Sequence, residues 1–166
     1  SEAKLAAELN HQNIVQIYDL GRINNSYFIA MEYIDGRDLS SIIAQTNFKK
    51  IPFPVEYVMK IASRVCEALD YAHNKCDSLD NRLQIVHRDI TPENIRMSWT
   101  GSVKVLDFGI AKVANAPNET KAGQLKGKIA YMAPELLQGK GIDHRSDLFS
   151  LGLIMYEAIV GFKLYT

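Results

Sequence analysis

Apolar side chains recur every three or four positions between residues 55 and 73, and this spacing predicts an amphipathic helix with one face in a core. Residues 146–160 are instead apolar almost all round, which predicts a helix buried in the middle of its lobe. A shorter helix is expected over residues 39–45, with Asp38 as its N-cap. The repeated apolar positions of the longest helix are Val55, Val58, Ala62, Val65, Leu69 and Ala72.

Two pairs of short runs rich in β-branched and aromatic residues predict two β-hairpins. The first pair consists of residues 13–20 and 26–33, joined across residues 21–25. The second consists of residues 95–98 and 102–106, on either side of a Trp-Thr-Gly turn. This second hairpin is expected to bring residue 107 back toward residue 94.

Composition narrows the possible partners. The chain has 166 residues, enough for one domain with a core, and carries 19 basic and 19 acidic residues. A balanced charge creates no strong field toward nucleic acid or anionic lipid, so neither partner is favoured. Cys66 and Cys76 fit neither a disulfide framework nor a metal cluster, which favours a reducing, cytoplasmic compartment. The longest apolar run, residues 148–160, is too short to span a bilayer, so no membrane contact is expected from this segment.

The candidate chemistry lies in residues 87–94, which read His-Arg-Asp-Ile-Thr-Pro-Glu-Asn, and in an Asp-Phe-Gly triplet that begins eighteen residues after Asp89. Pro92 disfavours a helix, so this stretch should form an irregular loop that aims Asp89 and Asn94 at one point. Phosphoryl transfer needs a carboxylate at the attacking hydroxyl and oxygen ligands for Mg²⁺. Asp89 can supply the first, and Asn94 and Asp107 the second. Taken alone, the triplet also fits an ordinary strand-ending turn.

With Ala-Pro-Glu at residues 133–135, these motifs resemble the catalytic core of eukaryotic-like Ser/Thr protein kinases of the bacterial type. The resemblance implies an α+β fold, with residues 1–34 as a remnant of the small lobe and 35–166 as a mainly helical large lobe, incomplete at its C-terminus. It implies transfer of the ATP γ-phosphoryl group to Ser/Thr hydroxyls of a protein substrate, with Mg²⁺. The family's glycine-rich loop and strand lysine are absent from this sequence, so we expect negligible turnover from this segment alone.

The resemblance also implies a nucleotide site along the first hairpin. Residues 32–34 match the hinge, in which the backbone of Glu32 and Ile34 would bind adenine, and Met31 matches the gatekeeper beside it. Asp38 matches an acidic residue that contacts ribose. The alternatives are that Met31 is a core residue and that Asp38 is only a helix cap.

The same resemblance implies roles for five further residues. Residues 1–9 are expected to form the end of a helix in which Glu2 pairs with the strand lysine, although Glu2 also fits a solvated charge. Arg88 would capture a phosphothreonine, and Thr120, the sole hydroxyl residue between Gly109 and Gly127, is the predicted phosphosite. Asp147, a carboxylate at the start of a buried helix, should bond backbone amides and anchor the catalytic loop. Glu135 would pair with an arginine further along the family's sequence.

The sequence departs from the family at three positions. Thr91 stands where the family has a lysine, and Lys128 stands where the family has a threonine whose hydroxyl bonds the catalytic aspartate and that lysine. We hypothesise an exchange, in which Lys128 supplies the charge and Thr91 the hydroxyl. The alternative is a surface lysine and a neutral threonine. Arg96 replaces an apolar residue under adenine, where its stem can line the site with the guanidinium in water, or stack on the base.

Two other functions are compatible with the sequence. A small-molecule kinase of the aminoglycoside type shares the loop and the later aspartate, but residues 127–135 resemble a peptide-positioning segment and argue against it. A pseudokinase that scaffolds partners is disfavoured by the intact Asp89, Asn94 and Asp107, while Thr91 leaves it open. The sequence leaves the oligomeric state undecided.

Overall fold

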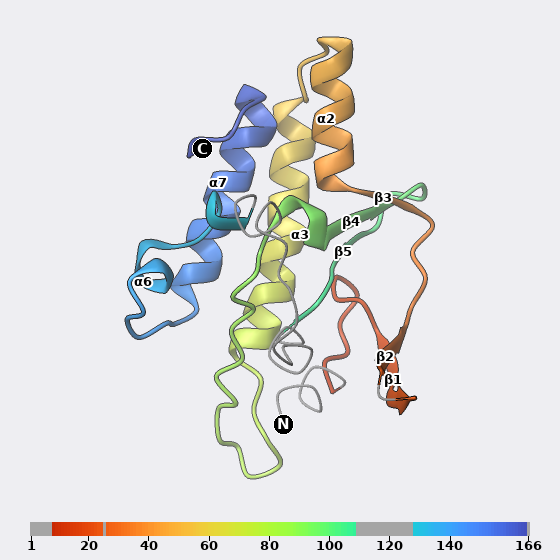
Figure 1. Cartoon of the computed structure of the whole chain (residues 1–166), viewed down its shortest axis with the longest axis vertical. Helices are drawn as coiled ribbons and strands as arrows, with labels where there is room; N and C mark the ends of the chain where they lie inside the picture. Colours follow the sequence, from red (N-terminus) through yellow and green to blue (C-terminus); the bar gives the residue numbers. More distant parts are fainter. Residues whose placement is uncertain (1–7, 25, 109–127, 166) are drawn as a thin grey trace.

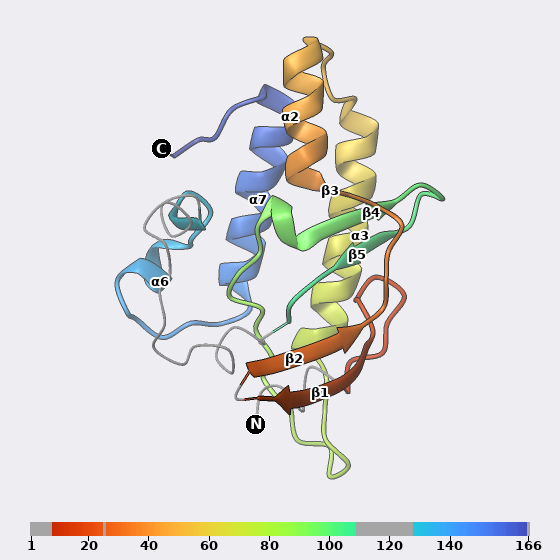
Figure 2. The ribbon, with the colours of Figure 1, turned by 45° about the vertical axis from the view of Figure 1, so that its right-hand side comes forward.

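The computed structural model describes residues 8–24, 26–108 and 128–165. Helices α2, α3 and α7 lie side by side, and a short three-stranded sheet, β3-β4-β5, packs beside α3 (Figure 1). The hairpin β1-β2 lies beyond β5 (Figure 2). The elements in chain order are β1 (Ile17–Ile23), β2 (Ser26–Met31), β3 (Gly36–Asp38), α2 (Leu39–Lys49), α3 (Val55–His73), the 3-10 turn η1 (Pro92–Asn94), β4 (Ile95–Ser98), β5 (Val103–Val105), α6 (Pro134–Leu137) and α7 (Arg145–Val160).

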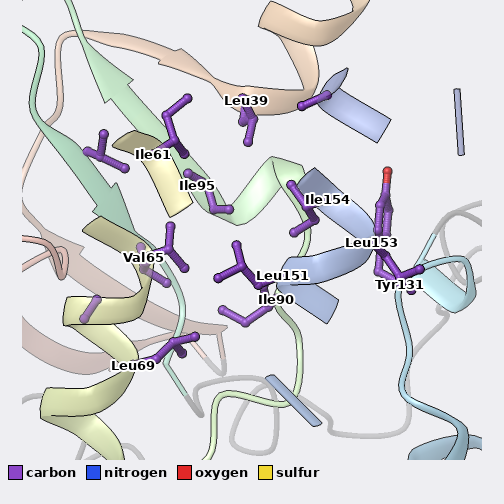
Figure 3. Close-up of a cluster of buried hydrophobic side chains, with 14 of the residues drawn as sticks. Leu39, Ile61, Val65, Leu69, Ile90, Ile95, Tyr131, Leu151, Leu153 and Ile154 are labelled. Carbon is purple, nitrogen blue, oxygen red and sulfur yellow. The ribbon is translucent and has the colours of Figure 1, made fainter. Parts of the chain in front are cut away.

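Helix α3 forms over the residues that the apolar spacing predicts. Its stripe is buried at every predicted position except Val55, which is half exposed in the first turn. The stripe packs against α7 and β5, and Figure 3 shows Val65 and Leu69 on one side of the core with Leu151 and Ile154 of α7 on the other. Removing such a side chain from water contributes about 1.5–3 kcal/mol, so this stripe fixes the position of the helix.

Helix α7 differs from the prediction of burial on all sides. Leu151, Ile154 and Ala158 are buried against the core, but Leu148 and Ile159 are exposed. The helix contacts α3 on one side, and Tyr131 bonds Glu157 on another, but the side that carries Leu148 and Ile159 stays exposed. Sequence could not separate the two faces, because both carry apolar residues. Among the described helices, none has the length and apolar character needed to cross a bilayer.

The first hairpin has other bounds than predicted. Strand β1 runs on to Ile23 and turns at Asn24, so residues 21–23 are strand and not loop. Only glycine fits at position 21 of this strand, because the ring of Phe28 lies over it. A Cβ atom there would come within 2.3 Å of the ring. Residues 13–15 leave this hairpin altogether, since the amide of Val15 donates to the carbonyl of Val105 in β5 at 2.9 Å.

The second hairpin is confirmed by the pairing of β4 with β5, in which Ile95 faces Val105. A third strand, β3, which the sequence pattern did not predict, pairs with the other edge of β4. Its first residue, Gly36, lies so close to β4 that a Cβ atom there would be 1.8 Å from the carbonyl oxygen of Met97. The chain leaving β2 is therefore held tightly against β4.

This close approach predicts a cost for any side chain at Gly36. Gly36→Ala should lower the free energy of unfolding by about 1–3 kcal/mol, because the backbone of β3 must move away from β4. Gly152→Ala is the matched control, since Gly152 lies on the exposed side of α7 with nothing near its Cβ position, and alanine should leave stability equal or raise it by up to about 1 kcal/mol. Urea denaturation measures both, and equal midpoints for the two variants would contradict the close approach.

Candidate active site

The loop of residues 87–94 is irregular as predicted, up to the turn η1 at its end. Ile90 is 2% exposed and lies in the hydrophobic core, where Figure 3 shows it beside Leu151. Pro92 opens the turn η1, where its fixed φ suits the first helical position. The core therefore holds the middle of the loop, and the polar residues on either side of Ile90 are placed by it.

Asp89, Asn94 and Asp107 come from the loop and from the end of the second hairpin. The side-chain nitrogen of Asn94 donates to the carbonyl oxygen of Asp89 at 2.8 Å and to its carboxylate at 3.2 Å. The amide of Leu106 donates to the carbonyl of Asn94 at 2.8 Å, so Asp107 directly follows a residue whose backbone bonds Asn94. The structure thus brings Asp89 and Asn94 into contact and places Asp107 at the neighbouring end of the hairpin.

Asp147 holds the backbone of this loop. It lies in the first turn of α7, is 1% exposed, and accepts hydrogen bonds from the amides of His87 at 2.9 Å and Arg88 at 2.8 Å. The ring of His73, the last residue of α3, bonds the same carboxylate at 2.8 Å. The expected bonding to backbone amides is present, and the amides belong to the loop. His73 was not singled out by sequence analysis, because its only signal was its place at the helix end.

The backbone at Arg88 and Asp107 is left-handed, with φ of 67° and 60°. This conformation costs a residue other than glycine on the order of 1–3 kcal/mol and persists only where neighbouring contacts enforce it. His87 joins the two places: its Nδ1 accepts from the amide of Asp89 at 3.2 Å, so the proton lies on Nε2, which donates to the carbonyl of Leu106 at 2.7 Å. The same ring packs edge-on against Phe108.

Lys128 and Thr91, the two positions of the hypothesised exchange, both lie near Asp89. The ammonium of Lys128 is 2.5 Å from the carboxylate oxygen Oδ2 of Asp89, with the lysine side chain 46% exposed and the aspartate 18%. Thr91 is buried and lines the same small cavity as Asp89 and Lys128. Lys128 is exposed, as the alternative has it, but its ammonium contacts the loop at Asp89.

Residues 32–36, which follow β2, form the edge at which a nucleobase is expected. The amide of Glu32 donates to the carbonyl of Gln16 at 2.8 Å. The amide of Ile34 has no acceptor among the residues that the structure describes, although Ile34 is only 6% exposed. Met31 is 37% exposed, which argues against the alternative that it is a core residue.

Asp38 caps α2, which is the alternative that sequence analysis gave for it. One carboxylate oxygen accepts from the amide of Ser41 and the other from the hydroxyl of Ser41, both at 2.8 Å. Burial alone would raise the pKa of Asp38, but the bonds from Ser41 and the charge of Arg96 outweigh it and leave the pKa below its ordinary value. The helix continues four residues beyond the predicted end, to Lys49.

Arg96 does not place its guanidinium in water, and that expectation is wrong. Its Nε donates to the carbonyl of Ile34 and its Nη2 to the carbonyl of Gly36, each at 3.0 Å. The reason is the pairing of β3 with β4, which brings these carbonyls within reach of the side chain. The three residues of β3 carry no strand pattern in the sequence, so this pairing is decided by tertiary structure.

Glu135 accepts a hydrogen bond from the hydroxyl of Ser146 at 2.5 Å, and this bond holds the pKa of Glu135 below its usual value. Arg88 lines a cavity of about 360 Å³ together with Arg82 and His144.

Two residues with a predicted role, Glu2 and Thr120, lie outside the part of the chain that the structure describes.

Asn94 and Asp107 suit Mg²⁺ by the chemistry of their donors. Because Nδ2 of Asn94 donates to Asp89, the oxygen Oδ1 remains as an acceptor. Within the described part of the chain no group of three or more His, Cys, Asp or Glu side chains is arranged for a metal. Mg²⁺ needs no such group, since it is usually held by one or two protein oxygens together with phosphate and water.

Comparison with known proteins gives one consistent result. A family model described as the protein kinase domain matches residues 1–166. The chain is 43% identical over 158 residues to the tyrosine-protein kinase MasK of Myxococcus xanthus and 38% identical over 165 residues to the serine/threonine-protein kinase PknB of Mycobacterium leprae. These matches cover 95% and 96% of this chain, which spans about a quarter of the length of either relative.

Solved structures agree with these matches. The crystal structure of the Mycobacterium tuberculosis PknI kinase domain superposes with a TM-score of 0.74 at 29% sequence identity. The superposition covers 96% of this chain and 55% of that one.

The contacts of Asp147 predict a large effect of a small substitution. Asp147→Asn leaves one of the two loop amides without an acceptor and should lower the free energy of unfolding by about 2–5 kcal/mol. Asp143→Asn is the control, because Asp143 is half exposed and pairs with the exposed Arg145 at 2.7 Å, so that its loss should change stability little. Urea denaturation of both variants measures the two changes in the free energy of unfolding. Similar decreases in both variants would contradict the role of Asp147 as the acceptor for the loop amides.

Proposed function

The chain belongs to the protein kinase domain family, and on that premise we propose that it transfers the γ-phosphoryl group of ATP to Ser/Thr hydroxyls of protein substrates. The observation that carries the proposal is the carboxylate of Asp89, held between Asn94 and Lys128 on a loop whose backbone Asp147 fixes. We assign residues 1–34 to the small lobe and 35–166 to the large lobe. The activity is proposed for the protein that carries this segment, since its relatives are about four times longer.

Asp89 receives the acceptor hydroxyl. Its carboxylate orients the hydroxyl oxygen toward the phosphoryl group and can take its proton as the new bond forms. Asn94 fixes the rotation of Asp89 by bonding both its carbonyl and its carboxylate. This arrangement keeps the carboxylate in one orientation before the substrate arrives, which lowers the entropic cost of reaction.

Asn94 and Asp107 would hold Mg²⁺, which when bound neutralises charge on the phosphates. For the nucleoside, the carbonyl of Glu32 and the amide of Ile34 would bind adenine, with Met31 beside the base. Support for this comes from the amide of Ile34, which finds no acceptor in the described part of the chain. Asp38 would reach ribose only by sharing the carboxylate that now caps α2.

Lys128 supplies the positive charge near the transferred phosphoryl group, and Thr91 supplies the hydroxyl of the exchanged pair. Fixed charge in a partly buried site stabilises the charge that develops during transfer. The 2.5 Å contact between Lys128 and Asp89 supports this role, as does the buried position of Thr91 beside them.

The remaining assignments concern regulation. Arg88 is the cation that would capture a phosphate on Thr120, and Glu2 is the carboxylate that would pair with a lysine of the small lobe. Glu135 and Asp147 are structural anchors on the same lobe. Mass spectrometry after autophosphorylation tests Thr120, and phosphate found only at other residues would remove it from the proposal.

Tyrosine is the second candidate acceptor, because MasK, at 43% identity, is named a tyrosine-protein kinase. PknB and PrkC of Bacillus subtilis, at 38% and 35% identity, are named serine/threonine-protein kinases. The two acceptors share the roles assigned to Asp89 and Lys128, so phosphoamino-acid analysis of the product decides between them.

The proposal predicts transfer of labelled phosphate from ATP to a generic protein substrate by the intact protein with Mg²⁺. Asp89→Asn should reduce the rate by about 10²- to 10⁴-fold, because the hydroxyl loses its proton acceptor. Asp80→Asn, in the exposed loop before the site, is the matched control and should keep full activity. Transfer to an aminoglycoside alone would indicate a small-molecule kinase, and no transfer by the wild type would indicate a scaffolding pseudokinase.

The exchange of Thr91 and Lys128 predicts strong coupling. Thr91→Lys and Lys128→Thr should each lower kcat/KM, and the double variant should recover part of the loss, since residues that act as one unit are non-additive. Labelled-ATP kinetics on the three variants measures the coupling. Single variants as active as wild type, or losses that simply add, would end this hypothesis.

A further inference from the structure

Two cations on neighbouring strands face residues 32–36. Arg96 of β4 and Lys104 of β5 are direct partners in the antiparallel register, so their side chains lie on the same face of the sheet. Two like charges in this position destabilise a sheet unless other groups neutralise them. Both are half-buried, which makes such compensation more important.

We propose that Arg96 and Lys104 form a clamp, defined as these two side chains with their acceptors in residues 32–36, that holds the nucleotide-binding backbone in position. Arg96 is then a positioning residue for ATP and not a stacking partner of the base. This inference rests on the proposed function for its consequence on ATP, whereas the clamp itself is a property of the protein without nucleotide.

Arg96 bonds the C-terminal part of residues 32–36. Its guanidinium bridges the carbonyls of Ile34 and Gly36 through two separate nitrogens, at 3.0 Å each. Hydrogen bonds from a charged donor are stronger than bonds between neutral groups. Only a planar, forked cation can reach two carbonyls in this way, so lysine at this position would not be equivalent.

Lys104 bonds the first residue of the segment 32–36, Glu32. Its ammonium lies 2.7 Å from the carboxylate of Glu32, with the two side chains 16% and 27% exposed. The same carboxylate accepts from the amide of Gln16 at 3.2 Å, and the carbonyl of Gln16 accepts from the amide of Glu32 at 2.8 Å. Glu32 is therefore fixed through both its backbone and its side chain.

The charges of this face balance. Asp38 is the register partner of Arg96 on the opposite edge, so that Asp38, Arg96 and Lys104 form one row across β3, β4 and β5. With Glu32 at the end of the row, two carboxylates offset two cations. The arrangement compensates the repulsion between Arg96 and Lys104 only while residues 32–38 stay against the sheet.

The clamp encloses the amide of Ile34, one of the two backbone groups proposed to bind the base. The amide of Ile34 belongs to the peptide between residues 33 and 34, and clamped groups lie on both sides of it: the side chain of Glu32 before it and the carbonyl of Ile34 after it. Fixing both sides sets the direction of this amide before a nucleotide arrives. Such preorganisation raises affinity by lowering the cost of ordering on binding.

The test uses the intact protein and two readouts. Hydrogen–deuterium exchange without nucleotide reports the backbone of residues 33–38, and equilibrium titration with a fluorescent ADP and Mg²⁺ reports affinity. Arg96→Met keeps an apolar stem but removes the bridge. It should speed exchange of the segment and weaken nucleotide binding about 5- to 30-fold, with kcat changed much less than KM.

Further variants separate the clamp from other roles of these side chains. Lys104→Met should act in the same direction as Arg96→Met, and Arg96→Lys should restore only part of the affinity. Arg37→Met is the matched control, because Arg37 is an exposed arginine on β3 that packs over the ring of Trp99. It should leave both readouts at the wild-type level.

Each outcome of these measurements either supports the clamp or overturns it. Unchanged exchange of residues 33–38 in both methionine variants would overturn the clamp. Faster exchange with unchanged affinity would overturn its role in nucleotide binding. An Arg96→Met variant that binds as well as wild type or better would show that the stem serves as the floor of the base, and would also overturn it. If the wild type binds no nucleotide, the proposed function fails, and the exchange measurement still decides whether the clamp exists.

Discussion

The buried carboxylate of Asp147 is the constraint on which the arrangement of the site depends. A carboxylate in this position without partners would cost several kcal/mol, so the two loop amides and the ring of His73 are as necessary as the charge itself. Because those amides belong to His87 and Arg88, the start of α7 fixes the backbone immediately before Asp89. The left-handed conformation of Arg88 is maintained in the same way.

The effect passes from the loop to the second hairpin through His87. Its ring bonds the carbonyl of Leu106, one residue before Asp107, while its backbone bonds Asp147. The chain as a whole has no net charge, yet two lysines at the site each pair with a carboxylate: Lys128 contacts Asp89, and Lys104 contacts Glu32. Positive charge is therefore placed by specific contacts and not by an overall excess.

Much of the framework follows from the sequence. The apolar spacing gave the bounds of α3 without error, because a helix that buries one face repeats its apolar residues at a period that short-range geometry sets. The second hairpin was also predictable, since its strands are separated by only a short turn. Pro92 was sufficient to predict an irregular loop, and the spacing of Asp89, Asn94 and Asp107 was sufficient to suggest phosphoryl-transfer chemistry.

Long-range pairing decided the rest. The start of β1, the strand β3 and the direction of Arg96 depend on contacts between residues about 60 to 90 positions apart, such as Val15 with Val105 and Arg96 with Ile34. The meeting of Lys128 with Asp89 spans 39 positions, so the sequence could suggest it but not establish it. The sequence by itself determined the long helix α3, the second hairpin and the irregular loop, and it indicated the side chains that we propose for the chemistry, because these depend on local periodicity and residue type. The tertiary structure alone decided which strand edges and carbonyls those side chains reach, because that depends on how distant segments pack.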